Sequence, residues 1–244
     1  MDVRNIMENL KNDITKGNKR LEQLLEIYAK WSAVDAQHGY YSSYTHSNYF
    51  KFFGIARLLN VKHIYDIGCG TRGLTHAFLM HHFPSSDNPD NNVSYHGIDC
   101  QGCESLDFDF FNKVFADGWN YNITFEQNEY PCRIVNRHNN IALKIGSGNG
   151  GRKAMTKMAE AYSNDFERVI IEVVGDEADI FSDEMNGFER LDFGDPYGRK
   201  YVFFTKYRKD INFLSSIKYD WMNDLFSIES VFMPQYDGMY ETFR

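Results

Sequence analysis

The sequence predicts an α/β protein: a doubly wound, mostly parallel seven-stranded sheet that closes with an antiparallel hairpin, plus an N-terminal helical cap. A short apolar run leads into a glycine-rich turn over residues 64–74, and similar strand-then-helix segments recur up to residue 186. The last two apolar runs flank Asp195-Pro196-Tyr197-Gly198, a turn signal that predicts a hairpin. Residues 132–135 are either a further edge strand or an irregular link. The predicted strands are 64–67, 94–98, 123–126, 141–145, 168–174, 188–193 and 201–204.

Length and charge limit the classes of partner. The chain of 244 residues is long enough for one α/β domain with accessory segments. Its formal net charge of −8 argues against binding to nucleic-acid phosphates, because such binding needs a basic face. A small-molecule partner is therefore expected.

Cysteine usage and hydropathy bear on the compartment. No apolar run approaches membrane-spanning length, and residues 1–10 are polar and amphipathic, unlike a signal peptide. Cysteines 69, 100, 103 and 132 show no disulfide framework. Cys100 and Cys103 form a lone CxxC without a second pair at zinc spacing, so no metal is expected. These features predict a cytoplasmic protein with reduced cysteines.

The first 50 residues predict helices followed by an aromatic segment. Apolar residues recur at helical spacing over 3–32, which indicates amphipathic helices that pack on the domain or form a homodimer surface. Residues 35–50 are dense in ring and hydroxyl side chains, and Ser47 is the expected N-cap of a helix ending near Asn60. The expected divisions are 1–46 for the helices and aromatic segment, 47–210 for the α/β domain and 211–244 for a C-terminal extension.

The turn after the first strand carries the strongest functional signal. Glycines at 68, 70 and 73 allow a sharp bend and close approach of a ligand to the backbone. The helix that follows points its free N–H groups into the same space. A dinucleotide pyrophosphate or S-adenosylmethionine would suit such a turn. Asp66, two residues before the first glycine, favours S-adenosylmethionine, because it can accept from the methionine ammonium directly or through water.

Asp66-Ile67-Gly68-Cys69-Gly70-Thr71 closely resembles motif I of the Rossmann-like (class I) S-adenosylmethionine-dependent methyltransferases, which usually have glycine where Arg72 stands. The resemblance implies S-adenosyl-L-methionine as the cofactor. In that family an acid ending the second strand takes the ribose hydroxyls, and Asp99 matches it, the alternative being a solvated acid. A side chain after the third strand, here Asn128 or Glu129, faces the adenine. The implied cofactor residues are Asp66, Gly68, Cys69, Gly70, Arg72, Gly73, Asp99, Cys100, Asn128 and Glu129.

The aromatic segment supplies the expected acceptor site. Small-molecule methyltransferases often place such a segment over cofactor and substrate, so the resemblance implies substrate contacts for Tyr40, Tyr44 and Tyr49. The alternative is a loop that only packs the N-terminal helices. His38 and His46 are the candidate catalytic bases, with Tyr40 or Tyr44 as alternatives; an alcohol acceptor would need a base and an amine would not.

A second glycine-rich loop, Gly146–Gly151, follows the fourth predicted strand. Ligand sites in such sheets gather outside the carboxyl ends of the strands. The loop resembles the one that lines the methyl-transfer site of the family, which implies that Ser147 contacts substrate. A flexible surface loop and a phosphate-binding nest are the alternatives.

The predicted function is an S-adenosylmethionine-dependent methyltransferase that methylates oxygen or nitrogen of a small molecule by in-line transfer. An RNA methyltransferase would need a basic groove and a lysine-acid-lysine-acid set. A catalytically idle module would only bind the cofactor. A nicotinamide oxidoreductase is disfavoured by Asp66 and by the terminal hairpin.

Overall fold

The computed structural model describes residues 52, 55, 56, 58–69, 93–99, 123–144, 151–173, 177–194 and 200–216. The chain divides into two compact units. One comprises Met1–Leu58, Thr71–Asn91 and Ile217–Arg244, and the other comprises Leu59–Gly70 and Asn92–Ser216. The second unit holds the whole sheet and helices α6 to α8.

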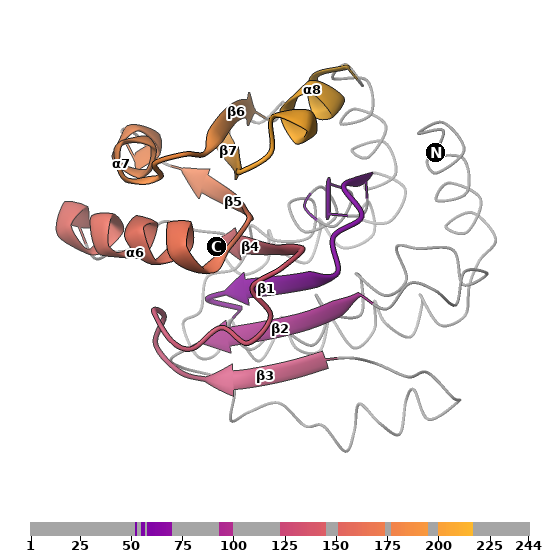
Figure 1. Cartoon of the computed structure of the whole chain (residues 1–244). Helices are drawn as coiled ribbons and strands as arrows, with labels where there is room; N and C mark the ends of the chain where they lie inside the picture. Colours follow the sequence, from indigo (N-terminus) through magenta and orange to yellow (C-terminus); the bar gives the residue numbers. More distant parts are fainter. Residues whose placement is uncertain are drawn as a thin grey trace, which may run out of the picture. The chain divides into compact units, whose positions relative to one another are not determined.

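Seven strands form one sheet in the order β3-β2-β1-β4-β5-β7-β6 (Figure 1). Strands β1 to β5 pair in parallel, whereas β7 lies antiparallel between β5 and β6. The strands are β1 His63–Ile67, β2 Ser94–Asp99, β3 Ile123–Gln127, β4 Asn140–Lys144, β5 Arg168–Val173, β6 Glu189–Gly194 and β7 Lys200–Thr205. The described helices are α6 Gly151–Asp165, α7 Glu177–Glu184 and α8 Arg208–Ser216.

The predicted fold class is confirmed: a mostly parallel seven-stranded sheet with a terminal hairpin, in which each strand lies within one residue of its expected ends. Residues 132–135 form an irregular link and not an edge strand. The expected helical cap over 3–32 lies outside the described residues, and the divisions at 46 and 210 stay predictions; α8 runs across residue 210. Within the described part of the chain, no helix has the length and apolar character needed to cross a membrane.

The central parallel strands are buried on both faces. Every residue of β5 is buried, as are Asn140 to Leu143 of β4. Strands covered on both sides read as continuous apolar runs, which is why the sequence marked them clearly. Parallel pairing also brings the carboxyl ends of β1 to β4 to the same edge of the sheet (Figure 1).

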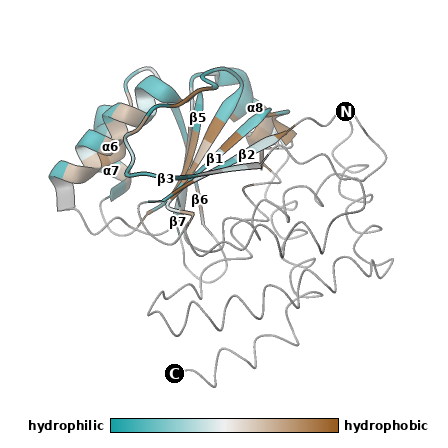
Figure 2. Ribbon diagram, turned by 90° about the horizontal axis from the view of Figure 1, so that it is seen from below, coloured by the Kyte–Doolittle hydropathy of each residue, from teal (hydrophilic) through white to brown (hydrophobic). Residues whose placement is uncertain are grey.

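Helices α6 and α7 pack on one face of this sheet through an aromatic cluster. The ring of Tyr162 in α6 stacks at 5.1 Å on Tyr130 and at 6.2 Å on Phe181 of α7, measured between ring centroids. Tyr65 of β1 contacts Phe166 at 5.4 Å, just past the end of α6. Figure 2 shows polar colours mixed with hydrophobic ones along both helices, as expected for helices with one buried face.

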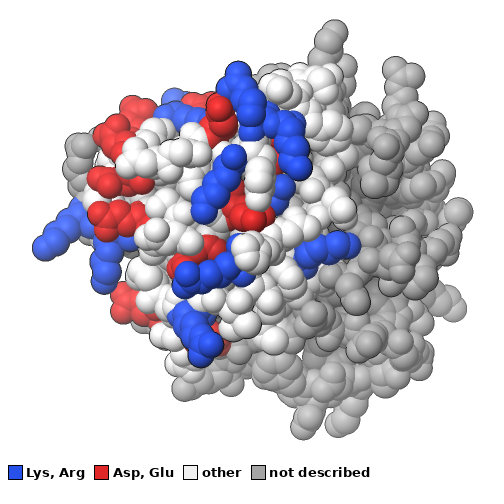
Figure 3. Space-filling model, viewed as in Figure 1, with Lys and Arg blue, Asp and Glu red and all other residues white. Residues whose placement is uncertain are grey.

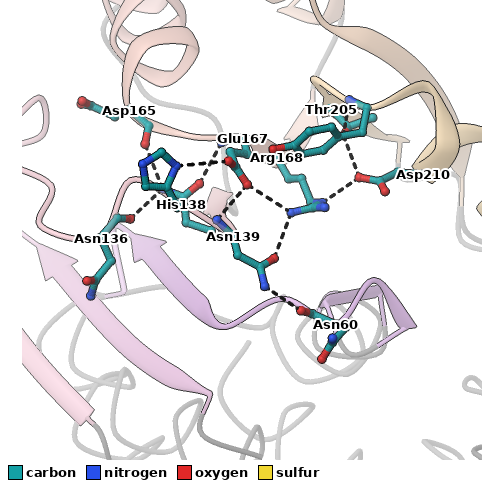
Figure 4. Close-up of polar contacts among 11 residues, drawn as sticks. Asn60, Asn136, His138, Asn139, Asp165, Glu167, Arg168, Thr205 and Asp210 are labelled. Atoms are coloured by element: carbon teal, nitrogen blue, oxygen red, sulfur yellow. Dashed lines mark hydrogen bonds and ion pairs between the residues drawn. The ribbon is translucent and has the colours of Figure 1, made fainter.

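A buried ion pair joins β5 to α8 at the edge of the sheet opposite the carboxyl ends of β1 to β4 (Figure 4). Arg168 Nε donates to Asp210 Oδ2 at 2.7 Å, and both side chains are almost fully buried. The Thr205 hydroxyl donates to the same carboxylate oxygen at 2.8 Å, and the guanidinium lies over the Tyr207 ring. These contacts hold the start of β5, the end of β7 and α8 together.

Amide side chains extend this network to the amino ends of β1 and β4. Asn139 adopts a left-handed φ of 49°, which asparagine tolerates, and its amide donates to the Asn60 carbonyl at 3.0 Å. Its backbone N–H donates to Glu167 Oε2 at 2.8 Å. Asn140 donates to the Asp165 carbonyl at 2.9 Å and accepts from the Glu167 N–H at 2.8 Å. The loops entering the central strands are thereby fixed to one another (Figure 4).

A line of polar side chains crosses β1, β2 and β3. The Ser94 hydroxyl lies 2.6 Å from His63 Nδ1 and 2.8 Å from His96 Nε2, and His96 Nδ1 lies 2.5 Å from Thr124 Oγ1. The Tyr65 ring stacks on His96 at 4.6 Å. Burial, with a smaller contribution from the charge of His63, lowers the pKa of His96 to about 4. His96 is therefore neutral in the folded protein at neutral pH.

Asp210→Ala should strongly destabilise the fold. It leaves the buried Arg168 guanidinium without its carboxylate, and breaking a buried pair in this way costs about 3–5 kcal/mol of unfolding free energy. Arg208→Ala is the matched control, because it breaks the solvent-exposed pair with Glu189 and should cost under about 1 kcal/mol. Urea unfolding measures both variants; equal losses would contradict the structural role assigned to the buried pair.

Because His96 is neutral in the folded protein, the free energy of unfolding should depend on pH in the acid range. The pKa of His96 is about 4 in the folded state against 6.5 for an ordinary histidine, so the unfolded chain takes up the proton first. The free energy of unfolding should fall as the pH drops from 6.5 towards 4. His96→Gln keeps hydrogen-bonding groups between Ser94 and Thr124 and should flatten this part of the profile in urea unfolding across that range. Parallel profiles for the two proteins would contradict the assignment.

Candidate functional site

The carboxyl ends of four neighbouring parallel strands form the candidate site. In strand order these ends are Gln127 of β3, Asp99 of β2, Ile67 of β1 and Lys144 of β4. The register pairs Ile67 with Ile98, and Asp99 with Gln127, so the ends are level with one another. Side chains that follow or end these strands therefore lie along one edge (Figure 1).

Gly68 begins the turn after β1 in a conformation that favours glycine. Its φ is +79°, and its N–H donates to the Ile98 carbonyl at 2.7 Å, so the turn is attached to β2 as it leaves the sheet. The backbone of Gly68 is exposed, whereas Cys69 is buried. A Cβ at position 68 would lie 3.0 Å from Lys144 Nζ. The Lys144 ammonium therefore lies close to the exposed Gly68 backbone.

Asp66 lies just inside the sheet. Its carboxylate is 0% exposed, and the Tyr95 hydroxyl donates to Oδ2 at 2.5 Å. This contact follows from the register: Tyr95 pairs with Ile64, so its ring reaches two residues along the same face of the neighbouring strand. Burial of this kind favours a role in shaping the end of β1, and the expected contact with a methionine ammonium stays a prediction.

A second phenol lies in the field of this carboxylate. The Tyr162 hydroxyl is buried and has no hydrogen-bond partner among the described residues. Burial raises its pKa above the ordinary tyrosine value, and the negative charge of Asp66 raises it further. The Tyr162 phenol is therefore neutral at neutral pH.

Asp99 and Asn128 lie together at the ends of β2 and β3. Asp99 is half-buried, and its carbonyl accepts from the Asn128 N–H at 2.9 Å. The Asn128 amide donates to Glu126 Oε1 at 2.8 Å, and Glu129 is exposed. The structure thus brings the expected ribose acid next to the first of the two expected adenine residues.

Lys144 is a site residue that sequence reasoning missed. It is half-buried at the end of β4, and its ammonium lies against Gly68. The available signal was a lysine that closes an otherwise apolar strand. Only the tertiary structure shows that β4 is adjacent to β1 and that this ammonium faces the glycine turn.

The remaining expected residues lie outside the described part of the chain, and their roles stay predictions. They are His38, His46, Tyr40, Tyr44, Tyr49, Gly70, Arg72, Gly73, Cys100 and Ser147. Among the residues that are described, no group of three His, Cys, Asp or Glu side chains is arranged to hold a metal ion.

Gly68→Ala should lower stability and displace Lys144. An L-residue in this left-handed conformation costs about 1–2 kcal/mol of unfolding free energy. Gly187→Ala is the matched control, because Gly187 has a φ of 80° but its added Cβ meets nothing within 4 Å. Urea unfolding should show similar losses for the two variants, because the Lys144 ammonium is the far end of a flexible side chain and can shift at little cost. A much larger loss for Gly68→Ala would show that the ammonium is held in place.

The comparisons with known proteins gave only structural likenesses. No family model and no curated protein matches the sequence. Monomeric WbdD aligns at 12% identity with a TM-score of 0.45, over 64% of this chain and 39% of WbdD. The METTL16 MTase domain aligns at 9% identity with a TM-score of 0.47, over 66% and 67%. The N-methyltransferase NodS from Bradyrhizobium japonicum WM9 aligns at 10% identity with a TM-score of 0.41, over 64% and 96%. This chain therefore spans about two fifths of the WbdD chains that it matches.

The strand order itself supports the assignment of the fold. The sheet is parallel from β3 to β5 and closes with β7 antiparallel between β5 and β6, which distinguishes it from the sheet of a dinucleotide-dependent dehydrogenase. The motif-like segment that begins at Asp66 lies at the carboxyl end of β1, in the middle of the parallel part. The described part of the chain therefore has the mostly parallel seven-stranded sheet with a terminal antiparallel hairpin that the resemblance to the Rossmann-like (class I) S-adenosylmethionine-dependent methyltransferases implied.

Proposed function

We propose that this chain is an S-adenosylmethionine-dependent methyltransferase that transfers a methyl group to oxygen or nitrogen of a small molecule. One observation carries the proposal. The exposed backbone of Gly68 lies at the end of β1, between the half-buried Asp99 of β2 and the half-buried Lys144 of β4. A carboxylate, an exposed backbone and a cation thus follow one another along one edge of the sheet.

The residues at this edge fit an adenosyl ligand. A carboxylate can accept hydrogen bonds from two neighbouring hydroxyls at once, so Asp99 would hold the ribose. Asn128, attached to the Asp99 carbonyl, has amide groups that can bond the edge of an adenine. Gly68 has no side chain and its backbone is exposed, so a ligand could approach the main chain closely there.

When bound, S-adenosylmethionine supplies a methyl group on a sulfonium, which is already an activated leaving group. The protein then has to hold the acceptor in line with that methyl and exclude water. The expected residues for this task are Tyr40, Tyr44, Tyr49 and Ser147 for the acceptor and His38 or His46 for its proton. A base is required only if the acceptor is a neutral alcohol.

A small-molecule acceptor is favoured over RNA by the distribution of charge. On the face shown in Figure 3, basic and acidic side chains are interspersed over the described residues. Arg190 pairs with Asp179 and Asp192, and Arg208 pairs with Glu189. Paired surface charges and a net charge of −8 give little attraction for a phosphate backbone.

Asp99→Ala should weaken cofactor binding. Removing a charged hydrogen-bond acceptor of the ribose hydroxyls should raise the dissociation constant for S-adenosylmethionine by at least about tenfold. Asp183→Ala, which removes an exposed acid from α7, is the control and should leave the constant unchanged. Isothermal titration calorimetry measures both. Unaltered affinity in Asp99→Ala would reject the ribose role, and absence of binding to the wild type would reject the proposed function.

The acceptor class is tested by the transfer of label from methyl-labelled cofactor into a metabolite extract and, separately, into total RNA. Label in low-molecular-weight material only would support the small-molecule proposal. Label in RNA would replace it with an RNA methyltransferase. Cofactor binding without transfer to either would favour an idle binding module.

A further inference from the structure

Lys144 is a charged residue at the end of an otherwise uncharged strand, β4. The four residues before it in β4 are buried, and three of them, Ile141 to Leu143, are apolar. Its own side chain is half-buried, and its ammonium lies 3.0 Å from the position that a Cβ of Gly68 would take. An ammonium held against an exposed glycine backbone can meet a ligand that lies on that backbone.

The strand order gives the direction in which a ligand would lie. β1 has β2 on one side and β4 on the other, so Asp99 and Lys144 flank the Gly68 turn from opposite sides. A ligand whose sugar is held by Asp99 and which crosses the turn therefore extends its other end towards β4. For an adenosyl ligand, that other end is the amino-acid part.

We propose that Lys144 binds the α-carboxylate of the amino-acid part of S-adenosylmethionine. The inference rests on the proposed function. It assigns a residue to the carboxylate of the cofactor's amino-acid part, whereas Asp66 of motif I is the expected partner of its ammonium. The amino-acid part carries a carboxylate, an ammonium and a sulfonium, and only the carboxylate attracts a lysine. The same charge disfavours an arrangement in which the ammonium of the amino-acid part, and not its carboxylate, faces Lys144.

Because the site is partly buried, this contact should contribute to the free energy of cofactor binding. A charged hydrogen bond with reduced access to water contributes more than one between exposed side chains. The left-handed turn at Gly68 and the length of the lysine side chain together place the ammonium beside the Gly68 backbone. Specificity for a ligand with a free carboxylate follows from this arrangement.

The test compares two ligands and two proteins by isothermal titration calorimetry. The ligands are S-adenosylmethionine and its decarboxylated form, which differ only in the carboxylate. The wild type should prefer S-adenosylmethionine by about 10- to 100-fold, the range for one charged hydrogen bond. In Lys144→Gln this preference should fall to nearly one, because the variant loses affinity for S-adenosylmethionine only. Lys144→Arg should retain part of it.

Lys157→Gln is the matched control, since it makes the same change at an exposed lysine of α6 and should keep the wild-type preference. Circular dichroism and urea unfolding check that each variant is folded. An unchanged preference in a folded Lys144→Gln would overturn the inference and leave the proposed function intact. Failure of the wild type to bind either ligand would overturn both.

Discussion

The left-handed turn at Gly68 is the constraint on which the candidate site depends. Its hydrogen bond to the Ile98 carbonyl attaches the chain to β2 at the point where β1 ends. The same residue has no side chain to obstruct Lys144 or a ligand. One backbone conformation therefore directs the chain out of the sheet and leaves the Gly68 backbone exposed, with the Lys144 ammonium beside it.

The polar side chains at the two edges of the sheet, where strands β1 to β4 begin and where they end, have different roles. At one edge, Arg168, Asp210 and the neighbouring amide side chains pair almost completely with one another, which fixes the loops that enter the strands. At the other edge, Asp99, Asn128 and Lys144 lie at or just after the ends of their strands, on either side of the exposed Gly68 backbone. Rigid attachment at the first edge holds the strand ends at the second edge in register, and binding groups need that precision.

Much of the fold was predictable from local signals. The apolar runs that became β4 and β5 are buried on both faces, and such strands show in the sequence without a partner being known. The turn after Asp66 was recognisable because glycine is required where φ is positive and Asp66 precedes it at motif spacing. The position of Asp99 was predictable for a related reason: an acid that ends a buried strand lies at the edge where ligands bind.

The sequence by itself determined the strands, the terminal hairpin and the two strand-end features, Gly68 and Asp99, because each depends on residues close together in the chain. Only the tertiary structure decided that Asp66 is enclosed by Tyr95 and that Lys144 faces Gly68. Both contacts join strands that are neighbours in space but lie far apart in the sequence. Strand order and register set such contacts, and local periodicity carries no information about either.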